Sequence, residues 1–474
     1  MSELLFGIIG FGITWMLTEA VAFLAGLIVV LRCLYRRVFD LKRTAVWLIS
    51  FYALPIITCI LWIMVGRPVY RHPPESPRAG DADAIDSLIG ARPEDEGLHL
   101  ARSLSVGGAM GYSEDSSCTL IDEGDGYIDG LLKDLGDARE SIYMEIYQIS
   151  RDDTSMKVMD ALCAKAREGL DVRVIFDDFG YDAKDKCHLK SLEKAGGRAV
   201  LFHNMTKYLF SPKKNARDHR KTAVIDGRIG YQGGFNIEDR YTGRGKLGRW
   251  RDAAVRIEGP QAGNLARLFA CTWEYVTKEP MTVSVNEEPC GNTPMQVVPG
   301  DPTEYPDNPA ENMFVALARQ ARSRLWIETP YFIPSEPMLK AVQSAAAAGV
   351  DVRIIIPSVP DHPAVYWANR RYADRAMGSG AKVYEFQDGF MHSKTVLVDD
   401  SVCCIGCTNF SNRSVKLNFE CSIVAYSEEL AAGLESDFLE DQGLSSEYTR
   451  GMYSSRTGTE KFRTALAMLF NEQL

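Results

Sequence analysis

Two long apolar runs open the chain. The first extends from Leu4 to Leu31 with Glu19 as its only charged residue, and the second extends from Thr44 to Gly66 without any charge. Each run is longer than the ~20 apolar residues that cross the hydrocarbon core of a bilayer. No Lys or Arg precedes Arg32, so the first run lacks the basic start of a signal peptide. The pattern predicts two transmembrane helices within residues 1–70.

The alternative interpretation is a pair of buried helices in a soluble domain, which runs of this length and hydropathy disfavour. Glu19 would be costly in contact with lipid, so we expect it to face the partner helix or the membrane interface. Pro55 is expected to kink the second helix because it lacks a backbone N–H.

Two spans would place the N-terminus and the large C-terminal part on the same side of the membrane. Basic residues occupy the short loop between the runs and the flank that follows the second: Arg32, Arg36, Arg37, Lys42, Arg43, Arg67, Arg71 and Arg78. The positive-inside rule would put the loop in the cytoplasm and the C-terminal part outside. Nine cysteines beyond the runs favour a reducing compartment instead. The side of the membrane therefore stays open.

The segment after the apolar runs is rich in Pro, Asp, Glu and Arg and poor in apolar residues, most clearly from His72 to about Gly97. This composition is typical of a linker, which we place at residues 71–110. The remaining chain divides into a first repeat, 111–285, and a second repeat, 286–474.

The two repeats contain the same blocks in the same order and at similar separations. The first copy reads SIYMEIYQIS, GLDVRVIFDDFG, GGRAVLFH and DHRKTAVIDGRIGYQGGFN, and the second reads RLWIETPYFIP, GVDVRIIIPSVP, GAKVYEFQ and MHSKTVLVDDSVCCIGCTN. Apolar residues at helical spacing, in Ser155 to Glu168 and Ser335 to Ala348, precede apolar strands at Asp171 to Phe176 and Asp351 to Ile356. This alternation predicts an α/β layer fold whose two halves pack about a pseudo-twofold axis.

Each repeat contains the motif H-x-K-x-x-x-x-D. The first copy is His219, Lys221 and Asp226, and the second is His392, Lys394 and Asp399. With seven histidines in the chain, and with any basic or acidic residue counted as a match, chance would give only ~0.1 such motif. Because residues two apart on a strand point to the same face, each His and Lys could enter one pocket from each half.

Charge and cysteine content narrow the choice of chemistry. A formal net charge of −10 argues against a dedicated nucleic-acid binder, so an anionic substrate must be held by local positive charge. Among the 11 cysteines, Cys403, Cys404 and Cys407 are the only cluster, and no fourth ligand stands at a zinc-like spacing. We interpret them as small buried residues beside a strand.

The paired motifs resemble the signature of the phospholipase D superfamily. The contexts NARDHRKTAVIDG and FMHSKTVLVDD, with TPYFIP, WRDAAVRIEGP, LNFE and the two apolar runs, are similar to bacterial cardiolipin synthases over nearly the whole chain. The resemblance implies an α/β fold of two phospholipase D-like α/β/α sandwich repeats preceded by two transmembrane helices. It also implies a phosphatidyltransferase that converts two phosphatidylglycerol molecules into cardiolipin and glycerol through a phosphohistidine.

The chemistry of a phosphodiester explains why these residue types recur. Lys221 and Lys394 would neutralise the anion and stabilise charge in the transition state. One imidazole would attack phosphorus, while the other would protonate the leaving alcohol and then deprotonate the incoming one. The resemblance implies His219 as the nucleophile and His392 as the acid/base. Since the lysines supply the positive charge, we expect neither a metal nor a cofactor.

Other residues are expected to support the histidines. Asp252 and Glu420 are candidates for carboxylates that orient the imidazoles. Asp226 and Asp399 complete the catalytic motifs, although each precedes a turn and is expected to hold the loop rather than touch substrate.

Both motifs are followed by a turn of small residues and an asparagine. The amides of Asn236 and Asn409 could donate to a phosphate oxygen. Cys407 stands where the family commonly has a hydroxyl residue, which puts a hydrogen bond from that side chain in doubt.

The motifs fix the reaction class but leave the substrate open. A phospholipase D or phosphatidylserine synthase would differ only in the accepting nucleophile, and a non-catalytic lipid-binding protein is disfavoured by the intact His and Lys of both repeats. We expect a phospholipid substrate, no nucleic-acid partner and a multi-pass protein of the bacterial plasma membrane. Association with further copies of the chain is left open.

Overall fold

The computed structural model describes residues 2–35, 41–62, 82–181, 187–208, 211, 214–302, 308–469, 471 and 473–474. The chain divides into two compact units. One contains Met1–Tyr70 with Met205–Ala216, and the other contains Arg71–Asn204 with Arg217–Leu474. The second unit contains all the predicted site residues and both repeats apart from residues 205–216.

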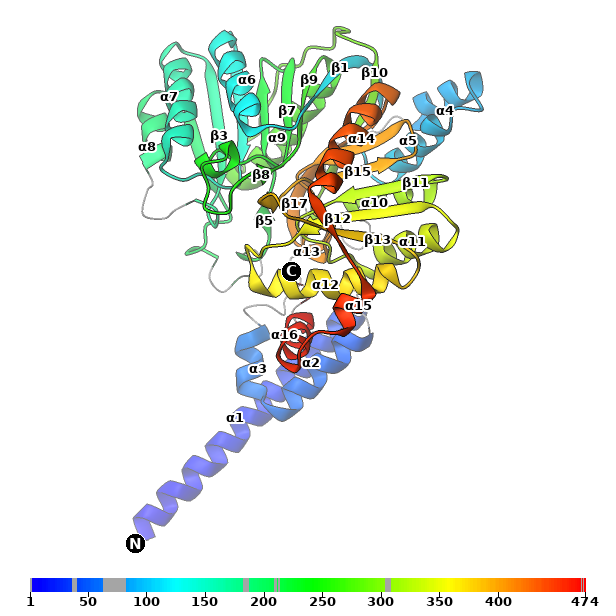
Figure 1. The fold of residues 1–474 in the computed structure, drawn as a ribbon. Coiled ribbons are helices and arrows are strands. Elements are labelled where there is room, and N and C mark those ends of the chain that lie inside the picture. Colours follow the sequence, from blue (N-terminus) through cyan, green and yellow to red (C-terminus); the bar gives the residue numbers. More distant parts are fainter. Residues whose placement is uncertain are drawn as a thin grey trace. The chain divides into compact units, whose positions relative to one another are not determined.

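Helices α1 (Ser2–Tyr35), α2 (Leu41–Ala53) and α3 (Pro55–Leu61) form the N-terminal unit (Figure 1). The second apolar run is broken at Leu54, because Pro55 starts a new helix, as the sequence predicted. Val30, Phe51 and Trp62 are buried together where the helices pack.

The two predicted transmembrane helices are not confirmed. Among the described residues, no helix reaches the length and hydropathy needed to cross a membrane. Glu19 is partly buried. The predicted basic positions Arg36, Arg37, Arg67, Arg71 and Arg78 lie outside the described residues, as do the side chains of Arg32, Lys42 and Arg43.

The described part of the predicted linker is folded. It forms α4 (Ala82–Ala91) and α5 (Glu96–Val106), and Asp95 caps α5 by accepting from the N–H of Leu98. Leu100 and Leu104 pack into the core of the second repeat. Residues 82–91 and 96–106 are thus helical, which their acidic and proline-rich composition did not indicate. The domain boundaries, including the linker at 71–110, stay a prediction.

The two repeats share one order of elements. The first contains β1 (Ser113–Ile121), α6 (Gly124–Asp137), β2 (Ser141–Ile146), α7 (Asp153–Arg167), β3 (Asp171–Asp177), α8 (Cys187–Lys194), β4 (Arg198–Phe202), β5 (Arg217–Asp218), β6 (Thr222–Ile225), β7 (Ile229–Gly233), the 3-10 helix η4 (Asp239–Thr242), β8 (Trp250–Arg251), β9 (Ala254–Glu258) and α9 (Pro260–Thr277). The second contains β10 (Thr293–Gly300), α10 (Pro309–Gln320), β11 (Arg324–Glu328), α11 (Glu336–Ala347), β12 (Asp351–Pro357), α12 (Pro363–Met377), β13 (Lys382–Phe386), β14 (Phe390–Met391), β15 (Thr395–Val398), β16 (Val402–Gly406), α13 (Asn412–Lys416), β17 (Asn418–Tyr426) and α14 (Glu428–Gly443).

Most strands of both repeats join in one sheet within the described chain, while β8 and β14 form a separate two-stranded sheet. From its middle outwards the first half runs β1-β9-β7-β6-β2-β3-β4, and the second runs β10-β17-β16-β15-β11-β12-β13. The halves meet where β1 pairs antiparallel with β10. The same order on both sides of this seam confirms the repeated α/β units that the sequence predicted.

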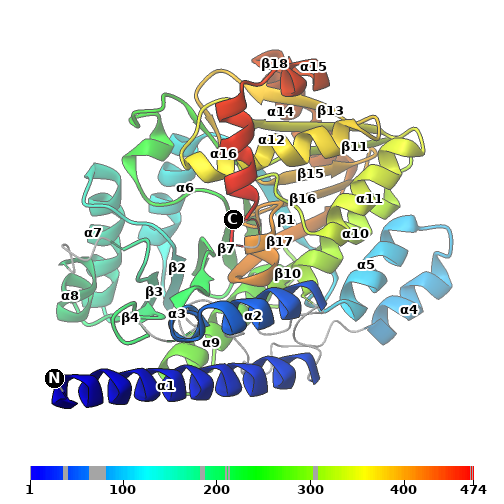
Figure 2. The ribbon, with the colours of Figure 1, turned by 90° about the horizontal axis from the view of Figure 1, so that it is seen from below.

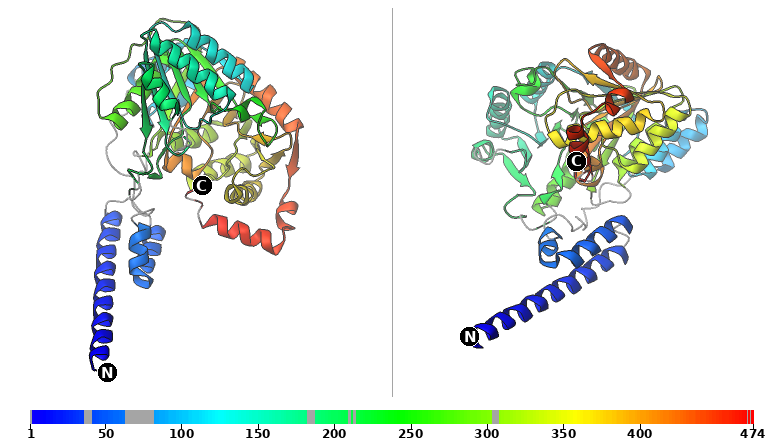
Figure 3. Two further views of the ribbon diagram at one scale, coloured as in Figure 1. Left: turned by 90° about the vertical axis from the view of Figure 1, so that its left-hand side faces the viewer. Right: turned by 60° about the horizontal axis from the view of Figure 1, so that its bottom comes forward.

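Helices cover both faces of each half-sheet because side chains on a strand alternate between faces. On β2, Ile142 and Met144 join the core under α6 and α7, while Tyr143 stacks on Phe269 of α9 with ring centroids 5.2 Å apart. In the second repeat, Leu325 and Ile327 of β11 face α10 and α11. Trp326 stacks on Phe438 of α14 on the opposite face, at 4.8 Å. The left view of Figure 3 shows the helices ranged along the sheet of the first repeat.

The second repeat continues into a C-terminal segment of β18 (Ser445–Tyr448), α15 (Arg450–Ser454) and α16 (Gly458–Met468). Strand β18 pairs antiparallel with β13 and extends the edge of the sheet. Helix α16 packs against α12 (Figure 2). This segment has no counterpart among the described elements of the first repeat.

Candidate active site

Each motif histidine is positioned by a strand of the opposite repeat. Strand β5 pairs parallel with β17, and the N–H of His219 donates to the carbonyl of Phe419 at 2.9 Å. In the same way β14 pairs with β8, and the N–H of His392 donates to the carbonyl of Arg251 at 2.7 Å. Each motif is therefore built against a strand of the other repeat.

The orienting carboxylates are exchanged between the repeats. Nδ1 of His219 lies 2.9 Å from Oε2 of Glu420, which belongs to the second repeat. Nδ1 of His392 lies 2.5 Å from Oδ2 of Asp252, which belongs to the first. A carboxylate beside Nδ1 holds the proton there and leaves Nε2 of each ring to react. The side chains of all four residues are buried.

The two lysines lie beside the same histidines. The Nζ atoms of Lys221 and Lys394 donate to the carbonyls of His219 and His392 respectively, the first at 2.8 Å. Nζ of Lys394 also lies 3.7 Å from Oδ2 of Asp252. The sequence predicted that each His–Lys pair lies on one continuous strand. Instead, the first pair lies between β5 and β6 and the second lies between β14 and β15.

Burial favours the neutral form of both imidazoles. It lowers the pKa of His219 to about 4, although the Glu420 carboxylate acts in the opposite direction. Burial, with the charges of Lys394 and Lys221, lowers the pKa of His392 well below its usual value. A neutral imidazole is the form that can act as a nucleophile.

The two carboxylates differ in protonation. Burial raises the pKa of Asp252 to about 6, against the opposing charges of Lys394 and Lys221. Burial would also raise the pKa of Glu420, but the charge and hydrogen bond of His219 outweigh it and lower that pKa. Burial lowers the pKa of Lys394 to about 7 and lowers that of Lys221 as well. The His392–Asp252 pair therefore takes up a proton closer to neutral pH than the His219–Glu420 pair.

The motif aspartates lie away from the histidines and hold turns. Asp226 accepts hydrogen bonds from the N–H groups of Arg139, Glu140 and Ser141, at 2.8 to 2.9 Å. Asp399 accepts from the corresponding N–H groups of residues 322–324, at 2.8 to 3.2 Å. Both aspartates have positive φ, 52° and 49°, in the left-handed region that Asp tolerates. They tie the start of the central strand of each repeat to its β-hairpin.

We predict that Asp399→Ala lowers stability without abolishing chemistry. The substitution leaves three backbone N–H groups without their acceptor and places alanine at positive φ, so it should cost about 2–4 kcal/mol of unfolding free energy. Thermal unfolding of the purified protein, with the specific activity of its folded fraction, measures both effects. Asp400→Asn is the matched control, because that neighbouring side chain is exposed. Loss of activity in a variant as stable as the parent would contradict the structural role.

The two turns, at 233–236 and 406–409, differ at their second and third residues. Gly234 packs so closely on Asp252 that an added Cβ would lie 1.9 Å from its Oδ1. Cys407 occupies the corresponding position of the second repeat, and its thiol donates to the carbonyl of Cys421 at 3.2 Å and accepts from the N–H of the same residue at 3.1 Å. The thiol thus turns towards β17. Cys403 and Cys404 are buried in β16, as the sequence predicted.

The two asparagines after these turns are buried. Oδ1 of Asn236 accepts from the N–H of Gln148 at 3.1 Å, and its Nδ2 donates to the hydroxyl of Tyr241. Oδ1 of Asn409 has no hydrogen-bond partner within the described part of the chain. A role for either amide in binding phosphate stays a prediction.

Aromatic residues that the sequence analysis missed surround the imidazoles. The ring of Tyr147 lies edge-on to His219 with centroids 4.5 Å apart, and the Lys221 ammonium lies 4.7 Å from the same ring. Tyr241 and Trp250 each lie 5.5 Å from the ring of His392. Tyr147 directly follows strand β2 in the block SIYMEIYQIS. Its place next to that strand was the signal in the sequence that could have identified it.

Two buried arginines that were also missed join the repeats around the site. Arg220, between the His and Lys of the first motif, donates to the carbonyl of Glu420 at 2.9 Å. Arg251, which precedes Asp252, donates to Asp441 on α14 at 2.6 Å. Each arginine therefore holds a strand that carries an orienting carboxylate.

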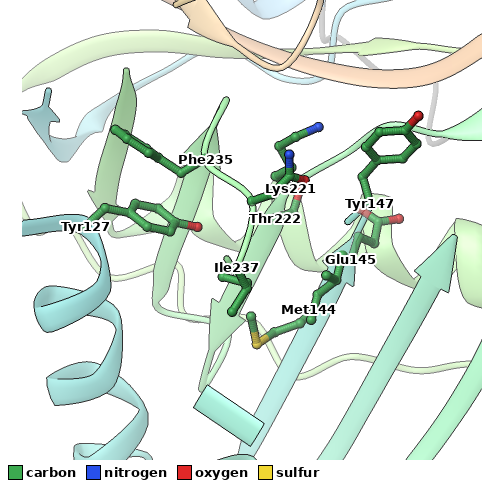
Figure 4. A pocket seen from close by; sticks show the side chains of 10 residues that line it. Tyr127, Met144, Glu145, Tyr147, Lys221, Thr222, Phe235 and Ile237 are labelled. Carbon is green, nitrogen blue, oxygen red and sulfur yellow. The ribbon is translucent and has the colours of Figure 1, made fainter. Parts of the chain in front are cut away.

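A small hollow opens beside Lys221 (Figure 4). Its wall is mainly apolar and includes Tyr127, Met144 and Phe235, with Lys221 and Asn236 among its polar members. The lining belongs to the first repeat, so the hollow adjoins one of the two half-sites.

One group of side chains has the donor types of a divalent-metal site. Ligand atoms of His219, Cys407 and Glu420 lie within 4.8 Å of one another. Sulfur, nitrogen and oxygen ligands suit a thiophilic ion. The charge of the buried Lys221 acts on the same Cys407 and Glu420 and would repel a cation there.

Comparison with known proteins identifies the family. A family model described as cardiolipin synthase, PLD-like domain, matches residues 131–273 and 314–442, one match in each repeat. The chain belongs to the cardiolipin synthase family of the phospholipase D superfamily. It is thus a phosphatidyltransferase that acts on phospholipid.

Curated cardiolipin synthases align with most of the chain. Cardiolipin synthase 1 of Staphylococcus aureus (strain COL) is 32% identical over 452 residues, which cover 90% of this chain and 92% of that protein. The cardiolipin synthase of Oceanobacillus iheyensis is 30% identical over 454 residues, covering 90% and 93%.

Solved structures share the fold at low sequence identity. The phosphatidylserine synthase of Haemophilus influenzae Rd KW20 superposes with a TM-score of 0.57 at 15% identity, over 75% of this chain and 95% of that one. The polyphosphate kinase of Porphyromonas gingivalis gives 0.50 at 14% identity, over 75% and 53%.

Proposed function

We propose that this cardiolipin synthase transfers a phosphatidyl group from one phosphatidylglycerol to another and releases glycerol. The observation that carries the proposal is the exchanged pairing, in which each repeat supplies the carboxylate for the histidine of the other. Such an arrangement makes two imidazoles and two ammonium groups act as one site. No nucleotide or metal is needed, because lysines supply the positive charge.

In the first step Nε2 of His219 attacks phosphorus. The bond from phosphorus to the glycerol oxygen breaks, and His392 gives that oxygen a proton. The phosphatidyl group is then bound to His219. Lys221 and Lys394 stabilise the charge on the phosphate oxygens throughout.

In the second step a terminal hydroxyl of another phosphatidylglycerol gives its proton to His392 and attacks the same phosphorus. The bond from phosphorus to His219 breaks, and cardiolipin leaves. Both protons move through His392, so the step ends with the site in its starting state.

The electrostatic difference between the half-sites supports this assignment. A lowered pKa at Glu420 keeps a carboxylate on Nδ1 of His219, which leaves Nε2 with its lone pair. The His392–Asp252 pair, with an Asp252 pKa of about 6, exchanges a proton nearer neutral pH, as a residue that passes a proton in both steps must. An anionic phosphodiester beside the lysines would raise the proton affinity of His392 further.

We also propose that α1 to α3 anchor the enzyme in the bacterial cell membrane, as the two apolar runs suggest. Large apolar side chains on these helices are exposed, including Met16, Val21, Ile28, Ile49 and Ile57. Exposed residues of this kind are stable in lipid and costly in water. Such an anchor would hold the site at the surface that contains its substrate.

The function is tested with the purified full chain in liposomes of phosphatidylglycerol, with EDTA present throughout. We expect cardiolipin and glycerol in equal amounts, without a nucleotide, measured by thin-layer chromatography and a glycerol assay. The Lys221→Ala/Lys394→Ala variant is the control. Phosphatidic acid as the only product would mean a hydrolase, and a strict need for a CDP-activated lipid would overturn the mechanism.

A further inference from the structure

Helix α16 presents an apolar stripe to solvent. Phe462, Leu466 and Leu469 are 68%, 48% and 75% exposed, although Thr464 and Ala467 on the opposite side are buried. Successive residues turn by about 100° around a helix, so the exposed three lie within one narrow sector. Met452 on α15 is also exposed.

Basic residues border this stripe. At about 100° per residue, Lys461 lies on one side of the apolar sector and Arg463 on the other. Both side chains are exposed. Residues 450–463 contain four basic residues, Arg450, Arg456, Lys461 and Arg463, and one acidic residue, Glu460. This local excess stands out in a chain with a net charge of −10.

Gln473 and Leu474 lie against α13. The carbonyl oxygens of Gln473 and Leu474 accept from the side chain and the N–H of Arg413, at 3.1 and 3.0 Å. Arg413 lies in α13, four residues after Asn409, and its charge is felt by Glu420. The stripe thus lies within a few positions in the sequence of residues that contact α13, next to Asn409.

We propose that α16 is an interfacial helix that inserts Phe462, Leu466 and Leu469 into the surface of an anionic phospholipid bilayer beside the active site. An apolar stripe bordered by Lys and Arg is typical of helices that lie in the membrane interface. The basic border complements the charge of phosphatidylglycerol, and the proposal rests on the lipid substrate of the proposed function. This contact would direct the catalytic site towards the headgroups it uses.

The contact is tested directly by photo-cross-linking. A benzoylphenylalanine replaces Phe462 in the full chain, which is reconstituted in phosphatidylglycerol vesicles and irradiated. We expect a mass increase of one lipid on the peptide that contains residue 462. The same replacement at Val106, which is equally exposed at 68% on α5, is the control and should take up little lipid. A cross-link to residues 2–62 or to a second copy of the chain would overturn the proposal.

The functional consequence is tested with two forms of the substrate. Phe462→Ser/Leu466→Ser should lower the rate on phosphatidylglycerol vesicles by about tenfold, because apolar burial in the interface is lost. The rate on dihexanoyl phosphatidylglycerol, monomeric in solution, should be unchanged, since that substrate needs no interface. Val106→Ser should alter neither rate.

The charged border has its own matched variants. Lys461→Glu/Arg463→Glu should weaken activity on vesicles, most at low salt, whereas Lys157→Glu/Lys194→Glu on the first repeat should not. Equal loss on vesicles and on the monomeric substrate would assign α16 a structural role and overturn the docking proposal. Absence of activity on either substrate in the parent enzyme would instead contradict the proposed function.

Discussion

Replacing His219 with alanine should abolish both cardiolipin formation and the covalent phosphatidyl-enzyme. The substitution removes the nucleophile, and the neighbouring His392 is held by Asp252 in a different role. The loss should be at least about 10⁴-fold in the steady-state rate. The adduct is measured by quenching the reaction and testing for an acid-sensitive phosphohistidine. Mass spectrometry of the peptide that contains residue 219 then locates it.

The His392→Ala variant should fail at a different stage. It can still form some adduct on His219, especially from a substrate with a good leaving group that needs little proton donation. The adduct should then accumulate, because no base activates the incoming hydroxyl. The double variant should be little worse than the worse single variant, since both residues act on one phosphate.

Two outcomes would contradict these expectations in different ways. An adduct on His392 in the His219→Ala variant would reverse the assignment and keep the mechanism. Half of the parent activity in each single variant would mean two independent sites, and the shared site between the repeats would be wrong.

Loss of either orienting carboxylate should be nearly as damaging. Glu420→Gln and Asp252→Asn preserve shape, but each removes the negative charge that fixes a proton on Nδ1, so each should lower kcat by about 10³-fold. Because the pairs are exchanged, Glu420→Gln should slow formation of the adduct on His219. Asp252→Asn should instead slow the steps that need proton transfer by His392, and a good leaving group should restore adduct formation.

The pH profile separates the two variants. As the pH falls through about 6, Asp252 takes up a proton and no longer accepts from His392, so the activity of the parent should decline on that side. This acid limb should disappear in Asp252→Asn and persist in Glu420→Gln. As the pH rises through about 7, Lys394 loses its charge in the free enzyme, and kcat/KM should decline in all three proteins. The Asp441→Asn variant is the control, because Asp441 bonds to Arg251 rather than to a histidine, and it should retain the acid limb. An acid limb that Glu420→Gln removes instead would contradict the exchanged pairing.

The repeats and their central strands could be read from the sequence because local signals were strong. The predicted strands at 171–176 and 351–356 are β3 and β12, and the predicted helices match α7 and α11 within two residues at each end. Helix α7 begins at Asp153, two residues before the expected start, because Asp152 and Ser155 form a capping box.

Prediction was weakest where composition and local pattern disagree. The segment at 82–106 was interpreted as a linker from its Pro and acidic content, yet Leu100 and Leu104 at helical spacing are buried in the core. Arg220 was not recognised either. A charged residue between two motif residues gives no sign that it is buried, since its partners lie some 50 to 200 positions away.

The sequence by itself determined the identity of the reacting groups: two His–Lys pairs in equivalent places of a repeat, with Asp252 and Glu420 as the candidate carboxylates. It could not assign each carboxylate to its histidine. That choice depends on β5 pairing with β17 and β8 pairing with β14, contacts between segments separated by some 140 to 200 residues. Motif spacing along a strand records only local geometry, whereas pairing across the seam is fixed by the packing of the two half-sheets. The tertiary structure therefore decided that Glu420 serves His219 and that Asp252 serves His392.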